Sequence, residues 1–291
     1  MSNIIKQHPR LFIAFSFALF FLVEILAMKE VLTLPQAIEV GPISVRLYGL
    51  LILSAILLVL GLVEREARQI KSLRKVNFTD LALYAVLFGV IGARLYHLVT
   101  DWHLYASNPI TALYVWNGGL GIFGAVLGGM LGVYLYIRSA KPPGTTRVNA
   151  LAIIDLIAVF MPLAQIIGRT GNLINHELYG WPTTVPWAWK ISSLNGSFEP
   201  TFLYEQVGLL ALFVTLLYFW GKREIGLDVG KLTLIYLAGY SLVRLLVEFA
   251  RTGERLLLGI FTANQVVCLL FIVVCGMGYV ARWSSNSVKK L

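Results

Sequence analysis

Eight long apolar segments follow one another through the chain and leave little room for a soluble fold. They cover residues 11–29, 46–63, 79–99, 113–137, 150–168, 201–220, 232–250 and 263–282. A helix needs about 20 residues to cross a hydrocarbon core of about 30 Å, and all eight are long enough to be helices rather than barrel strands. The composition agrees, since only 13% of residues are charged, against about 25% in soluble domains. The sequence therefore predicts an all-α transmembrane bundle of about eight spans with a small outer-face loop region.

The first apolar segment has two interpretations. A secretory signal peptide ends in a small-x-small cleavage site, whereas Met28, Lys29 and Glu30 follow this segment. It also contains Glu24. We therefore expect an uncleaved helix, with Glu24 in a structural role facing a neighbouring helix.

The basic residues are distributed unevenly between alternate loops. Sixteen of the 24 Lys and Arg residues fall in one set of loops, which includes both termini, and six fall in the opposite set. Loops rich in Lys and Arg stay in the cytoplasm, so both termini are predicted to be cytoplasmic. The net charge of +9 thus suits an anionic membrane surface rather than nucleic acid. The outer interface then carries an aromatic belt of Trp102, Trp116, Trp181, Trp187 and Trp189.

Two cysteines, Cys268 and Cys275, lie seven residues apart in one apolar segment and on one predicted helix face. We expect buried inert thiols there rather than a disulfide.

Six ionisable residues are expected to lie inside the bilayer: Glu24, Arg94, Asp155, Glu205, Arg244 and Glu248. Each costs about 2.5–3.5 kcal/mol or more in a bilayer and so needs a reason. Arg244 and Glu248 are four residues apart and can pair, which leaves a structural ion pair as one interpretation. The other is functional, because Arg169 at the outer edge can converge with Arg244, and two guanidinium groups form a good receptor for one phosphate.

The longest outer segment, 169–200, is where we expect function. It opens with the run Gly168-Arg169-Thr170-Gly171-Asn172-Leu173-Ile174-Asn175-His176-Glu177, which is polar and lies at a helix exit. A loop that only caps the helix is the alternative. In the glycine-rich stretch from Trp116, the spacing of Gly124 and Gly128 predicts close helix packing. Gly118 and Gly119 lie near the predicted outer surface, where they would admit a lipid headgroup.

These residues resemble the bacterial prolipoprotein diacylglyceryl transferase family. The run that begins at Gly168 looks like the family signature around its phosphatidylglycerol-binding arginine. Further blocks occur in the family's order, namely Leu47-Tyr48-Gly49-Leu50, Gly92-Ala93-Arg94-Leu95-Tyr96, Trp116-Asn117-Gly118-Gly119, Pro200-Thr201-Phe202-Leu203-Tyr204-Glu205 and the stretch 239–249. The resemblance implies three parts: an extra N-terminal transmembrane helix with its connector at 1–34, a transferase membrane domain at 35–282, and a cytoplasmic tail at 283–291.

The resemblance also implies a reaction and its residues. A lipobox cysteine thiol of a prolipoprotein attacks the glycerol carbon of phosphatidylglycerol, a thioether forms and glycerol phosphate leaves, in the inner membrane near its outer leaflet. No metal or cofactor is implied. Arg169, Asn172, Gly118 and Gly119 would bind the lipid. The residues expected to be catalytic are Arg244, Glu205, Tyr48, Tyr240 and Glu177.

The chain departs from the family at one proposed base. Many members carry a histidine where this chain has Phe123. His176 and Glu177 are substitutes in the right loop, although a histidine there is equally a structural hydrogen-bonding residue. Two other hypotheses are a non-catalytic paralogue that binds lipid or lipoprotein precursors, and a transporter. Transport would place polar sites at the midplane of paired repeats, whereas this chain has its polar groups near the predicted outer face.

Overall fold

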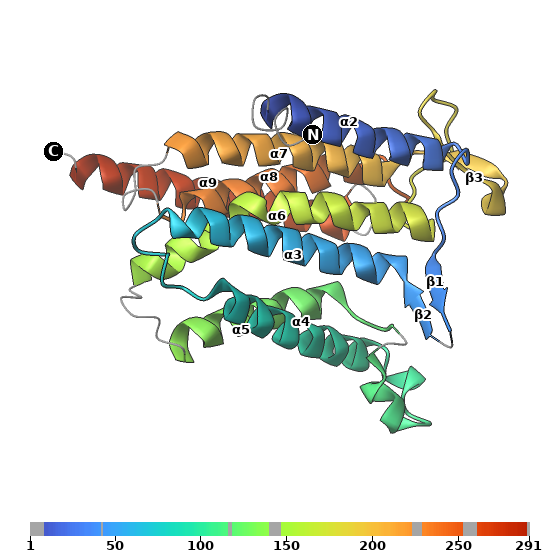
Figure 1. The fold of residues 1–291 in the computed structure, drawn as a ribbon, viewed down its shortest axis with the longest axis horizontal. Helices are drawn as coiled ribbons and strands as arrows, with labels where there is room; N and C mark the ends of the chain where they lie inside the picture. Colours follow the sequence, from blue (N-terminus) through green and yellow to red (C-terminus); the bar gives the residue numbers. More distant parts are fainter. Residues whose placement is uncertain are drawn as a thin grey trace. The chain divides into compact units, whose positions relative to one another are not determined.

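The computed structural model describes residues 9–41, 43–115, 118–139, 147–222, 229–252 and 261–289. Every predicted apolar segment overlaps an α-helix within this part of the chain (Figure 1). The helices are α2 (Pro9–Met28), α3 (Leu47–Arg68), α4 (Phe78–Thr100), α5 (Ile122–Ser139), α6 (Arg147–Asn175), α7 (Thr201–Lys222), α8 (Lys231–Glu248) and α9 (Ala263–Lys289). The predicted all-α membrane fold is confirmed.

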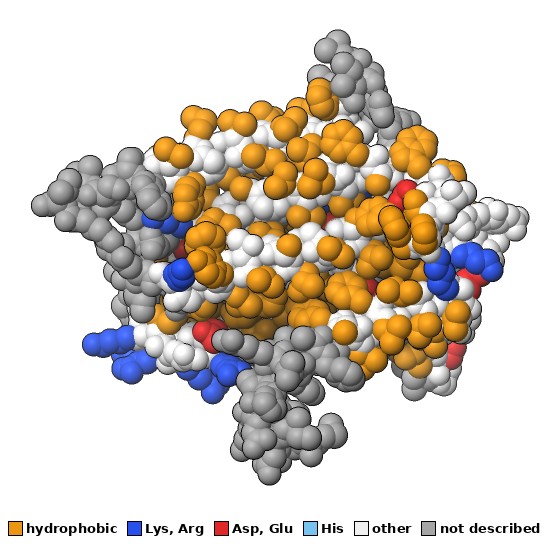
Figure 2. Space-filling view, turned by 90° about the horizontal axis from the view of Figure 1, so that it is seen from above, with side chains coloured by type: hydrophobic (Ala, Val, Ile, Leu, Met, Phe, Trp, Pro, Cys, Tyr) orange, Lys and Arg blue, Asp and Glu red, His pale blue; other side chains and the backbone are white. Residues whose placement is uncertain are grey.

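Six of the described helices are long and apolar enough to cross a bilayer: α3, α4, α5, α6, α7 and α9. The described apolar part of α2 is shorter, Ser16–Met28. The 18 residues of α8 include Lys231, Arg244 and Glu248, which lower its hydropathy. Hydrophobic side chains cover the middle of the face drawn in Figure 2, and charged side chains lie towards its edges. The protein is thus a multi-pass membrane protein.

The chain forms two compact units. The first contains residues 1–59 and 158–291, and the second contains residues 60–157. The boundaries between the units fall within α3 and α6.

Helices α4 and α5 of the second unit pack with their backbones in contact at glycines. A Cβ atom added to Gly124 would lie 2.1 Å from the Gly92 carbonyl oxygen, and one added to Gly128 would lie 2.1 Å from the Phe88 carbonyl oxygen. No side chain fits at either position, because the obstacle is backbone. The predicted role of these glycines in close helix packing is confirmed.

Replacing Gly124 by alanine should therefore destabilise the protein, and replacing Gly129 by alanine should not. Both changes gain about 1 kcal/mol of helix propensity. A Cβ at Gly129 would meet its nearest atom, the Ala85 carbonyl oxygen, at 3.5 Å, an ordinary contact. Overpacking at Gly124 costs about 1–3 kcal/mol, so Gly124→Ala should unfold at a lower temperature in detergent than Gly129→Ala. Equal unfolding temperatures would show that the helices separate freely at this point.

Helix α5 begins later than predicted. The expected helix 113–137 starts at Ile122, and the 3-10 helices η1 (Trp102–Leu104) and η2 (Pro109–Leu113) precede it. Arg94, buried on α4, organises this region by donating to five backbone carbonyls, those of Thr111, Ala112, Tyr114, Gly118 and Gly119. The local sequence gives no indication that backbone carbonyl oxygens compensate the buried charge of Arg94.

Two short antiparallel hairpins of the first unit were not predicted. Strand β1 (Ala37–Val40) pairs with β2 (Ile43–Arg46), and β3 (Trp189–Ile191) pairs with β4 (Gly196–Phe198). Strands of three or four residues are too short to show an alternating pattern.

The second hairpin covers a buried cluster that joins distant segments. Met28 of α2, Leu173 of α6, Trp189 and Ile191 of β3, and Phe202 of α7 form it. Trp189 is fully buried there, so its predicted place in an interfacial belt is wrong. Its ring packs edge-on against the Phe202 ring, with the centroids 5.0 Å apart.

The structure describes three of the other four predicted belt residues. Trp102, Trp181 and Trp187 are exposed, as a belt requires. Trp116 lies outside the described residues.

Both cysteines are free, as predicted. Cys275 is buried and Cys268 is partly buried.

Candidate active site

Three helices of the first unit bring Arg169, Glu205 and Arg244 together. Glu205, on α7, has a side chain that is only 3% exposed and accepts from both arginines. Its Oε1 lies 2.5 Å from the Arg169 NH2 on α6, and its Oε2 lies 3.4 Å from the Arg244 NH1 on α8. The sequence predicted that the two arginines converge. The structure adds that Glu205 is the carboxylate between them.

A second carboxylate continues the network. Glu248 Oε2 lies 2.9 Å from the Arg244 NH2 and 3.7 Å from the Arg251 NH1. The predicted pair between Arg244 and Glu248 is confirmed. Glu248 Oε1 accepts from Thr262 and Asn264, each at 3.2 Å, so both oxygens of this buried carboxylate are hydrogen-bonded.

Arg251 was not singled out from the sequence. It follows Arg244 by seven residues and Glu248 by three, a helical spacing that could have placed it on the same face. The segment that holds it is fixed by a bridge between Gly180 and Arg251. Burial lowers the pKa of Arg251, and the nearby Arg244 acts in the same direction. An arginine nevertheless stays protonated in a protein.

The charges of the described residues in this cluster do not balance. Among these residues, Arg169, Arg244 and Arg251 contribute three positive charges, and Glu205 and Glu248 contribute two negative ones. Within the part of the chain that the structure describes, Arg169 Nε is also buried without a hydrogen-bond partner. An unsatisfied buried donor costs about 1–3 kcal/mol. One monoanionic ligand would supply both the missing charge and an acceptor.

Helix α6 extends through Asn175, so residues 169–175 form about its last two turns instead of a loop. The prediction that a loop starts at residue 169 is therefore wrong. The helix places Arg169 and Asn172 three residues apart on one face, and Arg169 NH1 donates to Asn172 Oδ1 at 3.2 Å.

Glu177 lies at the end of this face. Asn172 Nδ2 reaches Glu177 Oε2 at 3.5 Å, and Asn175 Nδ2 donates to Glu177 Oε1 at 3.1 Å. Glu177 is exposed and contacts Arg169 only through Asn172 in these bonds. The geometry thus places Glu177 as a support for Asn172.

The two predicted tyrosines flank Arg169. Tyr240 of α8 interacts electrostatically with Arg169 and stacks on Tyr236, with ring centroids 6.2 Å apart. Tyr48 of α3 packs against Gly171, where an added Cβ would lie 1.8 Å from the tyrosine ring. A side chain at Gly171 would therefore displace Tyr48.

The candidate base His176, and Phe123 at the position where many members carry a histidine, make other contacts. His176 is exposed, has a φ of 54°, and its ring centroid lies 5.8 Å from that of Trp189. Phe123 belongs to the second unit, where its ring centroid lies 5.8 Å from that of Tyr96. Neither of these ring contacts involves the arginine cluster.

Gly118 and Gly119 also belong to the second unit. Both have positive φ, 88° and 69°, and both carbonyl oxygens accept from Arg94. A Cβ at Gly119 would lie 2.7 Å from Arg94 NH1. These glycines thus shape the turn around Arg94, and their predicted contact with a headgroup stays a prediction.

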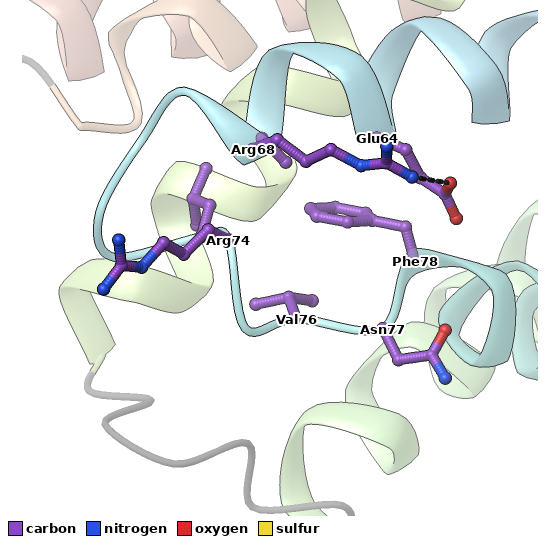
Figure 3. A pocket seen from close by; sticks show the side chains of 8 residues that line it. Glu64, Arg68, Arg74, Val76, Asn77 and Phe78 are labelled. Carbon is purple, nitrogen blue, oxygen red and sulfur yellow. Dashed lines mark ion pairs between the residues drawn. The ribbon is translucent and has the colours of Figure 1, made fainter.

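A narrow pocket without room for a water-sized sphere lies at the arginine cluster. Its lining residues are Arg169, Asn172, Leu178, Thr201, Phe202, Glu205, Arg244 and Arg251. Another pocket, of about 210 Å³, lies in the second unit beside the start of α4 (Figure 3). Its Arg68 is 78% exposed and pairs with Glu64 at 3.7 Å, and Figure 3 shows the Arg74 guanidinium directed away from Phe78. The buried, charge-unbalanced pocket is the stronger candidate for an active site.

The described residues contain no group of three or more His, Cys, Asp or Glu side chains that could hold a metal ion.

Fold and site together define a multi-pass membrane protein with a buried arginine–carboxylate cluster suited to an anionic ligand. More particularly, the chain belongs to the prolipoprotein diacylglyceryl transferase family, whose family model matches residues 35–281. The resemblance seen in the sequence is confirmed.

Named relatives support this assignment. The phosphatidylglycerol–prolipoprotein diacylglyceryl transferase of Parasynechococcus marenigrum is 41% identical over 228 residues, which are 75% of this chain and 80% of the relative. That of Synechococcus elongatus is 37% identical over 270 residues, 89% of this chain and 91% of the relative. That of Nocardia farcinica is 38% identical over 261 residues, 82% of this chain and 51% of the relative.

Proposed function

We propose that this protein transfers the diacylglyceryl group of phosphatidylglycerol to the lipobox cysteine of prolipoproteins. The cysteine sulfur forms a thioether with the glycerol carbon, the bond from that carbon to the phosphate oxygen breaks, and glycerol phosphate leaves. The thiol proton passes to an acceptor at the site or to solvent. The observation that carries this proposal is the unbalanced cluster of Arg169, Arg244 and Arg251 around two carboxylates.

The two central arginines would bind the phosphodiester. Phosphatidylglycerol carries one negative charge at its phosphate, which matches the one positive charge that the cluster leaves uncompensated. Guanidinium groups offer planar pairs of donors that fit phosphate oxygens. The leaving phosphate gains negative charge in the transition state, so prepositioned arginines would stabilise the transition state more than the bound lipid.

Glu205 would orient the arginines rather than remove the thiol proton. Each of its oxygens already faces a different arginine, at 2.5 Å and 3.4 Å. Neither oxygen is therefore free to accept the thiol proton while both ion pairs are intact. The arginines would instead favour the thiolate of the incoming cysteine, whose free thiol has a pKa of about 8.5.

The pocket must open for the lipid to enter. Ligand pockets occupy about 300–1,000 Å³, whereas the lining side chains here leave no room even for a water-sized sphere. Separation of Arg169 from Glu205 would enlarge it, because both residues line the pocket and hold it closed. We infer that the phosphate takes over part of the contact that Glu205 makes with Arg169.

Other parts of the assignment are proposals of the same kind. Residues 35–282 would be the transferase domain, and residues 1–34 an added helix with its connector. Tyr48, Tyr240, Asn172 and Glu177 would support the lipid-binding arginines, and Gly118 and Gly119 would border the headgroup.

The orientation in a bacterial inner membrane would place both termini in the cytoplasm and the arginine cluster near the outer leaflet, because sixteen of the 24 Lys and Arg residues lie in the loops on the side of the termini. A reporter fused after Leu291 should therefore fluoresce as a cytoplasmic protein. A strongly active alkaline phosphatase fusion at the same position, which needs export to fold, would contradict this orientation.

Complementation tests the function in cells. The gene should sustain a bacterium depleted of its own transferase, and mass analysis should find the diacylglyceryl group on a reporter lipoprotein. The Arg169→Ala variant, produced at an equal level in the membrane, should do neither. Accumulation of unmodified precursor with the wild-type chain would contradict the proposal and favour a non-catalytic paralogue.

A further inference from the structure

Helix α2 carries a buried carboxyl group that the proposed mechanism does not use. Glu24 is 1% exposed, and no other ionisable residue lies between Arg10 and Lys29. A carboxyl group inside an apolar helix is costly in a bilayer and calls for a specific partner. Helix α2 also lies before the stretch that matches the family, residues 35–281.

The partners of Glu24 are the chain neighbours of Arg169 and Glu205. Glu24 Oε1 accepts from Thr170 Oγ1 at 2.6 Å and from Gln206 Nε2 at 2.9 Å. Thr170 directly follows Arg169 on α6, and Gln206 directly follows Glu205 on α7. A second layer of hydrogen bonds thus joins the same two helices that Arg169 and Glu205 join.

This second layer is buried and cross-linked. Gln206 Nε2 also donates to the Ile166 carbonyl oxygen at 3.0 Å and reaches Thr170 Oγ1 at 3.4 Å. Glu24 and Gln206 are at most 1% exposed, and Thr170 is buried. Water does not compete for these bonds, so they constrain the helices strongly.

The end of α2 is fixed independently of Glu24. Lys29 Nζ donates to the Pro186 and Ala188 carbonyl oxygens at 2.7 Å and 3.1 Å. Glu30 accepts from the Ser192 hydroxyl and amide at 2.5 Å and 2.8 Å. Hydrogen bonds from Ser192 lower the pKa of Glu30 to about 2. This contact therefore stabilises the fold above the unfolded pKa of about 4.5 and is lost as the pH falls towards 2.

We propose that α2 is a built-in brace of the active site and that Glu24 is a positioning residue for the Arg169–Glu205 pair. Because Glu24 accepts hydrogen bonds from both Thr170 and Gln206, it fixes the spacing of α6 and α7 next to Arg169 and Glu205. A misplacement of about 1 Å at a catalytic group can cost about a hundredfold in rate. This inference rests on the proposed function for its kinetic consequence.

Two substitutions separate the hydrogen bonds that Glu24 accepts from its carboxyl group. Glutamine has a carbonyl oxygen that can accept from Thr170 and Gln206, whereas leucine leaves both donors without a partner. We expect Glu24→Leu to lower kcat by about tenfold or more, with the KM for a lipobox peptide nearly unchanged. Glu24→Gln should restore kcat to near the wild-type value, and Leu22→Ala, at an exposed position of the same helix, should match the wild type.

The rates are measured on the full chain in detergent and divided by the folded fraction from size-exclusion chromatography. If Glu24→Leu fails to fold, Thr170→Val replaces it, because valine keeps the shape of threonine and removes one of the two bonds to Glu24. Wild-type kcat per folded molecule in either variant would overturn the proposal, as would an equal loss of kcat in Glu24→Gln and Glu24→Leu.

Lipid affinity tests the positioning role of Glu24 separately from the proposed transferase function. The Kd for short-chain phosphatidylglycerol, measured by calorimetry, should rise in Glu24→Leu and stay unchanged in Leu22→Ala. If the wild-type chain transfers nothing, the proposed function fails. The comparison of Kd values then tests the positioning role of Glu24 by itself. An equal Kd in all variants would overturn it.

Discussion

Arg169→Lys should lower the rate of diacylglyceryl transfer by about a hundred- to a thousandfold, the cost of removing one charged contact that is made in a transition state. The three nitrogens of the Arg169 guanidinium have different surroundings. NH2 donates to Glu205, NH1 donates to Asn172, and Nε is buried without a partner among the described residues. A single ammonium group cannot reproduce that planar arrangement. The measurement is the turnover of a lipobox peptide with phosphatidylglycerol by the purified variant.

Arg68→Lys is the matched control for this prediction. Arg68 also pairs with a glutamate, but its side chain is 78% exposed and lies in the other unit. It should retain turnover within about twofold, because exposed ion pairs contribute little. Near-normal turnover in Arg169→Ala would remove Arg169 from the mechanism.

Glu205→Gln should have the second large effect, on stability as well as on turnover. The change leaves Arg169 and Arg244 facing each other around a neutral amide and raises the net charge of the cluster by one. Removing one partner of a buried ion pair costs about 3–5 kcal/mol. We therefore expect a much lower unfolding temperature in detergent, together with a loss of transfer activity in the molecules that remain folded.

Glu64→Gln makes the same chemical change at a partly exposed pair, in which the Glu64 side chain is 30% exposed. Glu64 lies 3.7 Å from Arg68 and also accepts from the Thr79 hydroxyl at 2.9 Å. We expect it to shift the free energy of unfolding by no more than about 1 kcal/mol. Similar losses of stability in Glu64→Gln and Glu205→Gln would mean that Glu205 is not the central counter-charge of the cluster.

The features that sequence predicts here are those set by local periodicity. The apolar segments form helices, Gly124 and Gly128 lie at close helix contacts, and Arg244 and Glu248 form an ion pair. Each of these depends on residues that lie three or four apart on one helix, or on the preference of a whole segment for lipid.

The features that sequence did not predict depend on pairings between distant segments. Nothing near Trp189 indicates that Met28 and Phe202 bury it. The bridging position of Glu205 follows from how α6, α7 and α8 pack together, and the partners of Glu24 are 146 and 182 residues away along the chain. Helix ends were also misplaced, because the polar residues 169–175 remain helical when their side chains find partners inside the protein.

Product analysis with purified components tests the central claim most directly. The protein is mixed with phosphatidylglycerol and a lipobox peptide, and both the peptide mass and the released glycerol phosphate are measured. The account predicts one thioether-linked diacylglyceryl group per modified peptide, an equal amount of glycerol phosphate, and neither product with a Cys→Ser peptide or with Arg169→Ala. A wild-type protein that leaves the peptide unmodified, or one whose product forms equally fast without Arg169, would contradict it.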